Sequence, residues 1–455
     1  MKNKLNEVIA IMAVPVLIFT FLSIQKTNLS FMKPVDFLSS IRATPKPAPV
    51  KALKPIKVPS GAESSGDSLI IPDTTVSYFG DLSRFLKAVN SLRDSSGVIH
   101  IAYFGDSMIE GDLITQDVRE SLQDTYGGSG VGFVPVTSVT AGFRTTIGHT
   151  FNNLWSSWNF NERPPEGIRL GPSGYVFKAG QGAEVVYRKA KDAKPFGKIS
   201  LLYSSKDSSL VHLGIDTSRE KHWLSPAEGI QSARLYNGKG CSRLRMEVQS
   251  GNPICYGFNF ESGPGLYLDN FSFRGNSGIP LAGLSQKILQ DFDKAMNYRL
   301  IVLHYGLNVV GHDIGNYDWY KERFRKAIRN IRQAFPHADI MLVSVGDKAH
   351  RSEYGWNTEP DIPRFVEIQA QLAAEEKIAF WNLYKAMGGY NTMKRWVENE
   401  NPKLGNMDYT HLNHRGAARV GNLFAAYLHQ QIALFSKSAI KKSTPLSFIQ
   451  HADSK

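Results

Sequence analysis

The sequence lacks the residues and motifs on which several large classes of protein depend. Its 455 residues include only two cysteines, which excludes a disulfide-rich scaffold and a zinc or iron–sulfur site built on cysteine. It contains no G-x-x-x-x-G-K-[ST] loop, no G-x-G-x-x-G after a strand and no H-E-x-x-H, so nothing indicates a nucleotide-binding or zinc-dependent enzyme. Apolar residues make up 42% and charged residues 21%, which excludes a wholly disordered, collagen-like or coiled-coil chain. We therefore expect a globular protein without a metal or other cofactor.

Basic charge is concentrated near the two ends of the chain. The formal net charge is +12, of which residues 1–66 contribute +6 and residues 436–455 contribute +3, leaving only +3 for everything between. A nucleic-acid-binding domain would concentrate basic residues on its folded face. We therefore expect no nucleic-acid partner, and we infer that the basic ends contact an anionic membrane or wall.

The N-terminal segment has the pattern of a membrane anchor. Lys2 and Lys4 precede an apolar run at residues 8–24, and 17 residues is close to the shortest membrane span of roughly 17–25. The run is longer than a typical signal-peptide core, and no small-residue cleavage site follows it. We predict that residues 1–25 form an uncleaved signal anchor in the inner membrane, with the catalytic part in the periplasm. A cleaved signal peptide and a buried soluble helix are the alternatives.

Two further segments have too few apolar residues to form a hydrophobic core. Within residues 26–66, the stretch from residue 42 is rich in proline, lysine and alanine and has no apolar period, which predicts an extended tether. Residues 436–455 are predicted to form a loose C-terminal tail. The folded part should therefore lie between these segments.

Strand and helix patterns alternate over residues 67–149 and 266–435. Buried strands are predicted at residues 98–103, 300–304, 339–345 and 378–383. Helical spacing occurs at residues 113–125, 280–297, 317–335, 362–376 and 415–435. Such alternation predicts a parallel sheet with helices on both faces, and ligand chemistry gathers at the carboxyl ends of strands in such sheets.

Residues 150–265 break this alternation. They contain short β-type runs with turn signals such as Asn237-Gly238 and residues 251–253. The runs fall at residues 184–187, 198–203, 211–215, 243–248 and 254–260. This pattern predicts an all-β module, a sandwich or jelly roll, inserted into the α/β domain.

Two sets of residues in this module have open interpretations. Trp155, Trp158 and Trp223 either belong to its core or offer flat apolar faces to sugar rings. Cys241 and Cys255 either form a disulfide, which export would allow, or remain free buried thiols.

Ser107 is the first candidate catalytic residue. It follows the predicted strand 98–103 and Gly105, whose small size allows a tight turn that presents the hydroxyl at the sheet edge. A serine hydroxyl needs an adjacent base to act as a nucleophile. The alternative is that Ser107 only caps the following helix.

Three other segments offer the groups that such a serine needs. Asp408 precedes His411 by three residues in a polar loop, a spacing at which a carboxylate can orient an imidazole, and His414 is a rival without such an acid. Asn308, after Gly306 and the strand 300–304, can donate to an oxyanion, as can backbone N–H groups in the turn 274–278. Each of these is also compatible with ordinary turn chemistry.

Together, and in this order, the four segments resemble the SGNH (GDSL) hydrolase family. The resemblance rests on Gly105-Asp106-Ser107, Gly278 in the run RGNSG, Gly306-x-Asn308 and Asp408-x-x-His411. It implies a flavodoxin-like three-layer α/β domain with a parallel sheet. It also implies a catalytic triad of Ser107, Asp408 and His411, and an oxyanion hole formed by Ser107, Gly278 and Asn308. Gly105, Asp106 and Gly306 would support this site.

One departure from simple members of the family narrows the resemblance. Ser107 and Gly278 stand 171 residues apart, so the β module is inserted between them. This arrangement, and the run 105–135, are similar to exported two-module peptidoglycan O-acetylesterases. Asn308 is followed by Val309 where many members carry Asp, which puts only the local loop geometry in doubt.

The resemblance implies a membrane-anchored serine esterase that removes O-acetyl groups from a cell-envelope polysaccharide, with peptidoglycan as one candidate. Its substrate partner would be the acetylated polysaccharide. A polysaccharide O-acetyltransferase that uses the same acetyl-enzyme, supplied by a membrane acyltransferase partner, is the first alternative. A non-catalytic glycan-binding envelope protein is the second, although the intact candidate residues argue against it. The sequence leaves open the glycan, the acyl group and the oligomeric state.

Overall fold

The fold is known from a computed structural model, which describes residues 80–92, 96–311 and 314–443. The predicted signal anchor at residues 1–25 and linker at residues 26–66 lie outside the described residues, as does the end of the predicted tail. Among the helices of the described ranges, none combines the length and the hydropathy needed to cross a bilayer.

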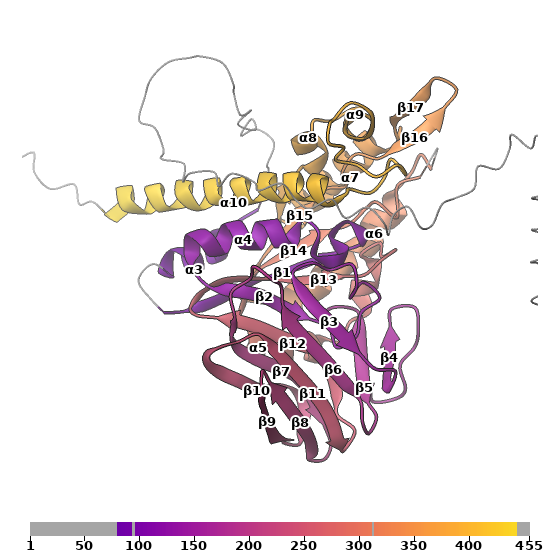
Figure 1. Ribbon diagram of the computed structural model, residues 1–455. Helices are drawn as coiled ribbons and strands as arrows, with labels where there is room; N and C mark the ends of the chain where they lie inside the picture. The colour runs from indigo at the N-terminus through magenta and orange to yellow at the C-terminus, as the bar shows by residue number, and fades with distance from the viewer. Residues whose placement is uncertain (1–79, 93–95, 312–313, 444–455) are drawn as a thin grey trace, which may run out of the picture. The chain divides into compact units, whose positions relative to one another are not determined.

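A five-stranded parallel sheet forms the centre of the α/β part, as predicted (Figure 1). Every pair of neighbouring strands in it is parallel. In spatial order the strands are β13 (Gly265–Ser272), β1 (Val98–Gly105), β14 (Tyr298–His304), β15 (Asp339–Val343) and β18 (Ala379–Trp381). Successive residues of β1, β14 and β15 are buried almost without exception, so helices cover both faces of the sheet.

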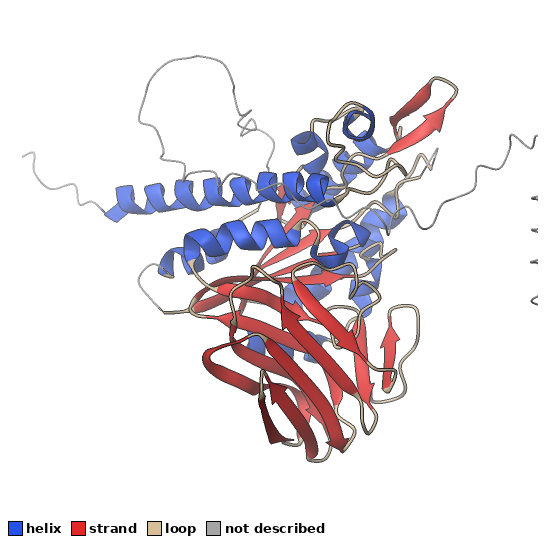
Figure 2. Cartoon of the chain, in the orientation of Figure 1, coloured by secondary structure: helices blue, strands red, loops and turns tan. Residues whose placement is uncertain are grey.

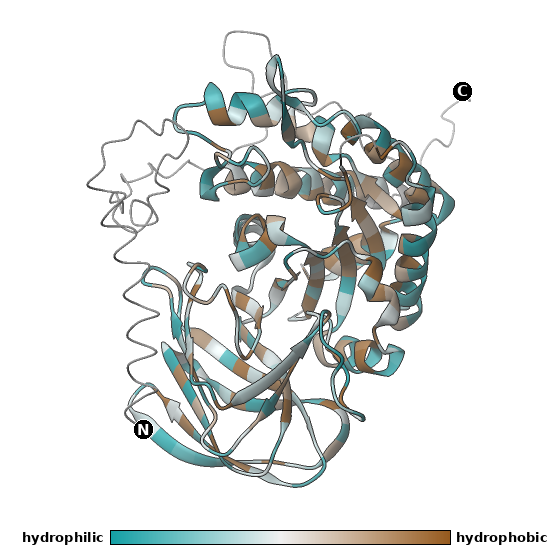
Figure 3. Ribbon diagram, turned by 90° about the vertical axis from the view of Figure 1, so that its right-hand side faces the viewer, coloured by the Kyte–Doolittle hydropathy of each residue, from teal (hydrophilic) through white to brown (hydrophobic). Residues whose placement is uncertain are grey.

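The predicted helices are present, and most of their ends shift by only a few residues. The helix predicted from residue 280 begins at Gln286, after a short 3-10 turn. The loose tail predicted from residue 436 is wrong for its first part, because the last helix continues to Ser443. One group that packs together is α3 (Ser83–Ser91), α4 (Thr115–Tyr126) and α10 (His414–Ser443). A second group is α5 (Gln286–Met296), α6 (Asp318–Ala334) and α7 (Ile362–Glu375). Shorter elements at the loops are η2 (Ser107–Asp112), η3 (Ile279–Gly283), α8 (Leu383–Met387) and α9 (Thr392–Glu398). Figure 3 shows the apolar residues gathered along the central strands and the inner sides of the helices.

The all-β part is a sandwich of two antiparallel sheets (Figure 2). One sheet has the order β10 (Ala227–Cys241), β7 (Phe196–Ser205), β12 (Ile254–Ser262), β5 (Tyr175–Ala179) and β4 (Trp155–Asn159), with β2 (Ser129–Val134) also paired to β12. The other has the order β3 (Ile147–Phe151), β6 (Glu184–Lys189), β11 (Arg243–Ser250), β8 (Ser209–Ile215) and β9 (Ser218–Leu224). An α/β domain with an additional β module is therefore confirmed, while the exact domain boundaries stay a prediction.

The first of these sheets is buried on both faces because alternate side chains enter two different cores. Phe177 and Cys255 belong to the core between the two sheets. Their neighbours Val176 and Tyr256 belong to the core of the α/β part, as does Leu202. Since successive residues of a strand point to opposite faces, the sheet is shared between the sandwich and the hydrophobic core beneath the parallel sheet.

Three finer predictions concern the β module: a turn, the three tryptophans and the two cysteines. The turn predicted at Asn237-Gly238 is wrong, because both residues lie inside β10. Trp155 is buried and Trp158 is packed against the core, whereas Trp223 on β9 is 61% exposed. Cys241 and Cys255 are free, buried thiols rather than a disulfide.

Candidate active site

Ser107 lies directly after the carboxyl end of β1. The strand ends at Gly105, where an added Cβ would stand 2.9 Å from the side chain of Ile109, so a larger residue would displace the turn. Asp106 caps η2, because its carboxylate accepts the N–H of Met108 at 3.0 Å. The strand end and this cap together fix Ser107 as the first residue of η2 at the sheet edge.

Ser107, His411 and Asp408 form a continuous chain of hydrogen bonds. The distance from Ser107 Oγ to His411 Nε2 is 2.9 Å, and the distance from His411 Nδ1 to Asp408 Oδ2 is 2.7 Å. The other oxygen of Asp408 accepts the backbone N–H groups of Thr410 and His411, each at 3.0 Å. With a proton on Nδ1 facing Asp408, His411 can accept the hydroxyl proton of Ser107 at Nε2.

The electrostatics of this chain suit a base. The hydrogen bond that His411 donates to Asp408 raises the pKa of His411 above its usual value of 6.5, against a smaller opposing effect of burial. Burial alone would raise the pKa of Asp408, but the hydrogen bonds from His411 outweigh it and lower that pKa to about 2. Asp408 is therefore ionised at neutral pH and favours a positive charge on His411.

A hairpin that the sequence did not predict holds the Asp408–His411 turn. It consists of β16 (Ala349–Ser352) and β17 (Gly355–Thr358). Its Trp356 stacks on Tyr409 with ring centroids 3.9 Å apart and planes 7° from parallel. The backbone N–H of Ala349 also donates to the carbonyl of Tyr409 at 2.8 Å. Because Tyr409 has a positive φ of 56°, these contacts offset a conformation that costs free energy outside glycine.

Gly278 lies where no other residue fits. Its φ is +84°, and an added Cβ would stand 2.4 Å from Phe324 and 2.8 Å from Tyr305. Its N–H donates to Asn276 Oδ1 at 2.8 Å. The predicted oxyanion donor is therefore engaged by Asn276 in this structure.

The amide of Asn308 is likewise engaged. Its Nδ2 donates to Asp106 Oδ2 at 2.9 Å and to the carbonyl of Asn276 at 3.2 Å. Gly306 allows this loop, with a φ of 133° and an added Cβ that would stand 2.7 Å from Phe365. Burial raises the pKa of Asp106 to about 7, against the lowering effect of its hydrogen bonds.

The spacing of the sequence assigns no role to Asn276 or to an ion pair at the edge of the site. Asn276 is buried and contacts two of the three predicted oxyanion donors, Gly278 and Asn308, while its own Nδ2 has no hydrogen-bond partner. Arg274 pairs with Glu110 of η2, with Nη2 and Oε2 2.6 Å apart. Asn276 and Arg274 lie in the quoted RGNSG run. The contact of Asn276 with Gly278 is local, whereas the contacts with Asn308 and Glu110 are tertiary and leave no signal in the spacing.

Of the other residues considered, His414 lies at the start of α10 and stacks on Phe143 with centroids 5.0 Å apart. The hydrogen-bond chain from Ser107 runs through His411 instead. In the described part of the chain, no group of three or more His, Cys, Asp and Glu side chains is placed to hold a metal ion.

Comparisons with known proteins support the family resemblance. Residues 256–419 match the GDSL-like lipase/acylhydrolase family. The match begins within β12, after most of the inserted sandwich, and includes Gly278, Asn308, Asp408 and His411 but not Ser107. No curated protein sequence matches the chain.

The fold is similar to that of a peptidoglycan O-acetylesterase, at 18% sequence identity and a TM-score of 0.65 over 78% of this chain and 99% of the other. A family two carbohydrate esterase from Clostridium thermocellum is 10% identical, covering 63% of this chain and 99% of the other at a TM-score of 0.26. An acetyl xylan esterase is 21% identical, covering 35% and 79% at a TM-score of 0.28. Only the first is close enough to compare the whole fold. Residues 256–419 thus match a GDSL-like acylhydrolase domain, and the fold of the chain is similar to that of an O-acetylesterase with a comparable extent.

Proposed function

We propose that this protein is an exported serine esterase that removes O-acetyl groups from a cell-envelope polysaccharide. The observation that carries the proposal is the hydrogen-bond chain Ser107–His411–Asp408 at the carboxyl end of β1. A nucleophile, a base and an orienting carboxylate in this order perform acyl transfer in unrelated folds, so the geometry supports the role directly.

The first half of the reaction forms an acetyl-enzyme. Ser107 Oγ attacks the acetyl carbonyl carbon while His411 Nε2 takes the hydroxyl proton, and the carbonyl oxygen becomes an oxyanion. The tetrahedral intermediate collapses, the ester C–O bond breaks, and His411 returns the proton to the departing sugar oxygen. Asp408 stabilises the imidazolium that forms in between, which its ionised state at neutral pH allows.

The oxyanion is held by the N–H of Ser107, the N–H of Gly278 and the amide of Asn308. Before substrate binds, Gly278 donates to the amide oxygen of Asn276, and Asn308 donates to the carboxyl group of Asp106 and to the carbonyl of Asn276. An oxyanion is a stronger acceptor than the amide oxygen of Asn276, so Gly278 transfers its hydrogen bond as negative charge develops. Asp106 and Asn276 act as positioning residues that hold the two donors until then.

The second half is hydrolysis. A water molecule loses a proton to His411 and attacks the acetyl carbon, and acetate leaves as Ser107 regains its proton. The side chains of His411 and Asp408 are 38% and 50% exposed, so solvent reaches the base. Water can therefore serve as the acceptor of the acetyl group, as an esterase requires.

The substrate class and location rest on weaker support. The whole fold, including the sandwich, is similar to that of a protein described as a peptidoglycan O-acetylesterase. The apolar run at residues 8–24 and the basic, proline-rich segment after it fit a tether that holds the catalytic part outside the inner membrane.

The test is to incubate the purified full-length chain with O-acetylated peptidoglycan and with other acetylated polysaccharides, and to measure released acetate. We expect acetate from at least one envelope glycan with the wild type and none above background with Ser107→Ala. Release from aryl acetates but from no polysaccharide would overturn the proposed substrate. Acetyl transfer to an added glycan in preference to water would replace the esterase by a transferase.

A further inference from the structure

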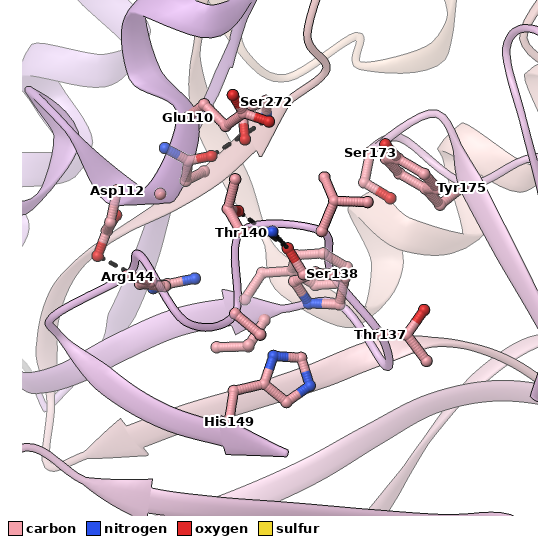
Figure 4. Close-up of a pocket in the computed structure, with 17 residues that line it drawn as sticks. Glu110, Asp112, Thr137, Ser138, Thr140, Arg144, His149, Ser173, Tyr175 and Ser272 are labelled. Atoms are coloured by element: carbon pink, nitrogen blue, oxygen red, sulfur yellow. Dashed lines mark hydrogen bonds and ion pairs between the residues drawn. The ribbon is translucent and has the colours of Figure 1, made fainter. Parts of the chain in front are cut away.

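The pocket drawn in Figure 4 does not contribute to holding the base His411. It lies between η2 and the sandwich, and its lining, over the described residues, includes neither the hairpin β16–β17 nor the turn 408–411. Its charged side chains are already in ion pairs, as for Arg144 with Asp112 at 3.0 Å. The contacts that hold the base in place occur instead where the hairpin meets the turn.

Tyr409 stands between Asp408 and His411 in a strained backbone conformation. Its φ is 56°, a left-handed value that costs free energy for a residue with a bulky side chain. A residue in such a conformation stays there only while its surroundings hold it. Because Tyr409 belongs to the turn, a relaxed backbone at this residue would move the imidazole of His411 away from the carboxylate of Asp408, which is 2.7 Å from it.

Three contacts from other elements hold Tyr409. The ring of Trp356 on β17 stacks on the ring of Tyr409, with centroids 3.9 Å apart and planes 7° from parallel. The N–H of Ala349 on β16 donates to the carbonyl of Tyr409 at 2.8 Å. The hydroxyl of Tyr409 donates to Glu398 Oε1 of α9 at 3.1 Å. Of the two contacts from the hairpin, only the stack depends on the side chain of the hairpin residue, so Trp356 is the residue to substitute.

The same segment also contacts the loop that carries Asn308. Lys348, the residue before Ala349, donates from Nζ to the carbonyl of Val310. The N–H of Val310 donates to the carbonyl of Gly306 at 3.0 Å, so Asn308 lies within a tight turn. Two adjacent residues of one segment therefore hold the base turn and the loop of a proposed oxyanion donor.

The root of the hairpin is itself fixed. Thr358, the last residue of β17, donates from Oγ1 to Asp347 Oδ1 at 2.8 Å. Asp347 Oδ2 accepts the N–H of Met393 on α9 at 2.7 Å, and Figure 1 shows the hairpin projecting beside this helix. Asp347 and Thr358 are both buried, which shields these bonds from water. A hairpin anchored in this way can hold Tyr409 in place rather than follow its movements.

We propose that residues 348–358 are a positioning element that holds the base His411 and the oxyanion donor Asn308 at a fixed spacing. The segment acts on the base turn through the stack of Trp356 and on the Asn308 loop through Lys348. Each of these two acts through another residue, so both are positioning residues. The proposal rests on the proposed function, because it assigns a supporting role in the same reaction.

The test measures kcat, KM and the pH profile of the full-length protein on an aryl acetate. Trp356→Leu keeps an apolar side chain but loses the flat ring. We expect kcat to fall about 10- to 100-fold with KM changed less than about threefold, since a 1 Å displacement of a catalytic group can cost about 100-fold. Trp356→Phe restores a stacking ring and should return kcat to within about threefold of the wild type. Tyr354→Leu, 90% exposed in the turn of the same hairpin, is the matched control and should keep wild-type kinetics.

The pH profile separates positioning from a general loss of structure. The hydrogen bond to Asp408 is the largest effect on the pKa of His411, and Asp106 and Arg274 are the other charged groups that act on it. A looser turn weakens that hydrogen bond and leaves the other two charges in place. In Trp356→Leu, the rise of kcat/KM with pH should therefore move to lower pH.

Lys348→Met tests the contact with the oxyanion loop. It removes the donor to the carbonyl of Val310, and we expect kcat to fall about 3- to 10-fold with the midpoint of the pH profile unchanged. If Lys348 acts through Asn308, the two substitutions are not additive. The loss caused by Lys348→Met should then shrink to less than about twofold in an Asn308→Ala background.

Unchanged kinetics of a folded Trp356→Leu variant would overturn the proposal, as would a lower kcat with the pH midpoint in place or a loss that Trp356→Phe does not restore. Thermal unfolding is measured for every variant; if Trp356→Leu does not fold, Lys348→Met and its combination with Asn308→Ala decide. If the wild type cleaves no ester, the proposed function fails, and the segment is judged by NMR titration of His411. A lower midpoint in Trp356→Leu than in the wild type would support the proposal, and equal midpoints would overturn it.

Discussion

Two histidines in this chain contact carboxylates, and their surroundings give them opposite roles. His411 meets one carboxylate, Asp408, at 2.7 Å in an exposed turn, and its second nitrogen faces Ser107. His100 on β1 meets two carboxylates, Glu261 and Asp269, each at 2.9 Å, and is fully buried. One imidazole has a nitrogen available for proton transfer, whereas the other has both nitrogens committed.

The burial of His100 explains why it is structural. Burial alone would lower its pKa, but the two carboxylates outweigh that effect and raise it to about 9. Glu261 lies on β12 of the sandwich, and Asp269 lies on β13 of the parallel sheet. A charged His100 therefore links the two parts of the fold, whereas the proposed mechanism has His411 change its charge during each turnover. Of these two His–carboxylate pairs, only the one whose free nitrogen faces a serine hydroxyl and solvent is placed to act as a base.

The largest expected effect is at His411. His411→Gln should lower kcat on an aryl acetate by roughly 10⁴- to 10⁶-fold, because the base of a triad is lost. Its half-exposed position predicts a thermal midpoint within a few degrees of the wild type. Stopped-flow or steady-state kinetics and a melting curve check both parts. His414→Gln is the matched control, and a comparable loss of kcat there would mean that the wrong histidine has been identified.

At His100 the effect should fall on stability instead. His100→Gln leaves Asp269 without the charged group that pairs with it and leaves Glu261 with Lys198 alone. Breaking a buried ion pair costs about 3–5 kcal/mol in the free energy of unfolding. Denaturant titration measures this cost. The folded fraction should keep its turnover per molecule. A variant as stable as the wild type would show that the buried cluster does not hold the two parts together.

At Asn308 the effect on rate should be smaller than at His411. Asn308→Ala removes one oxyanion donor, and such a loss costs roughly 10²- to 10³-fold in kcat. It also removes a hydrogen bond to the buried carboxylate of Asp106. Asn316→Ala, in the loop before α6, is a control for general loop effects. A change in kcat below about threefold at Asn308 would mean that its amide keeps its contact with Asp106 during catalysis.

The pH dependence of stability should report on His100, and the pH dependence of activity should report on His411. The folded-state pKa of His100, about 9, exceeds its unfolded value of 6.5, so its contribution to stability is fully present below pH 6.5 and is lost as the pH rises through 9. Thermal midpoints measured between pH 6 and 10 should fall over this window, and less so in His100→Gln. Equal slopes in both proteins would contradict the raised pKa.

Activity should increase with pH, whereas stability should decrease. His411 must be neutral to act as a base, so kcat/KM should rise with pH through a pKa above 6.5. Asp408→Asn removes the hydrogen bond that raises this pKa, so the rise should move to lower pH while kcat falls. A pH profile whose midpoint stays in place in Asp408→Asn would show that another group controls activity.

Much of the site could be predicted because its signals are local or follow from the order of elements. Asp408 and His411 share one turn, and Ser107 and Asn308 each follow a buried strand whose carboxyl end lies at the same sheet edge. The engagement of Asn308 by Asp106 and Asn276 could not be predicted, because these contacts join loops far apart in the sequence and spacing carries no information about them. The contact of Gly278 with Asn276 spans only two residues, but the pattern of the turn does not show which acceptor its N–H meets.

In the fold, too, features with local sequence signals could be predicted and features that depend on long-range contacts could not. The strands β1, β14 and β15 were evident as apolar runs between helices, whereas β13 was missed because it directly follows the β-rich module. The sequence also gave no sign that Val176, Leu202 and Tyr256 complete the core of the α/β part. Since the sandwich buries these side chains there, removal of the module would expose the hydrolase core.

The most direct test of the account is to detect the acetyl-enzyme. The full-length protein is mixed with an aryl acetate, quenched in acid within milliseconds and analysed by mass spectrometry of its peptides. The account predicts an acetyl group on the peptide that contains Ser107, formed in a burst before steady-state turnover and absent from Ser107→Ala. Turnover without a burst and without an acetylated peptide, together with near wild-type activity of Ser107→Ala, would contradict it.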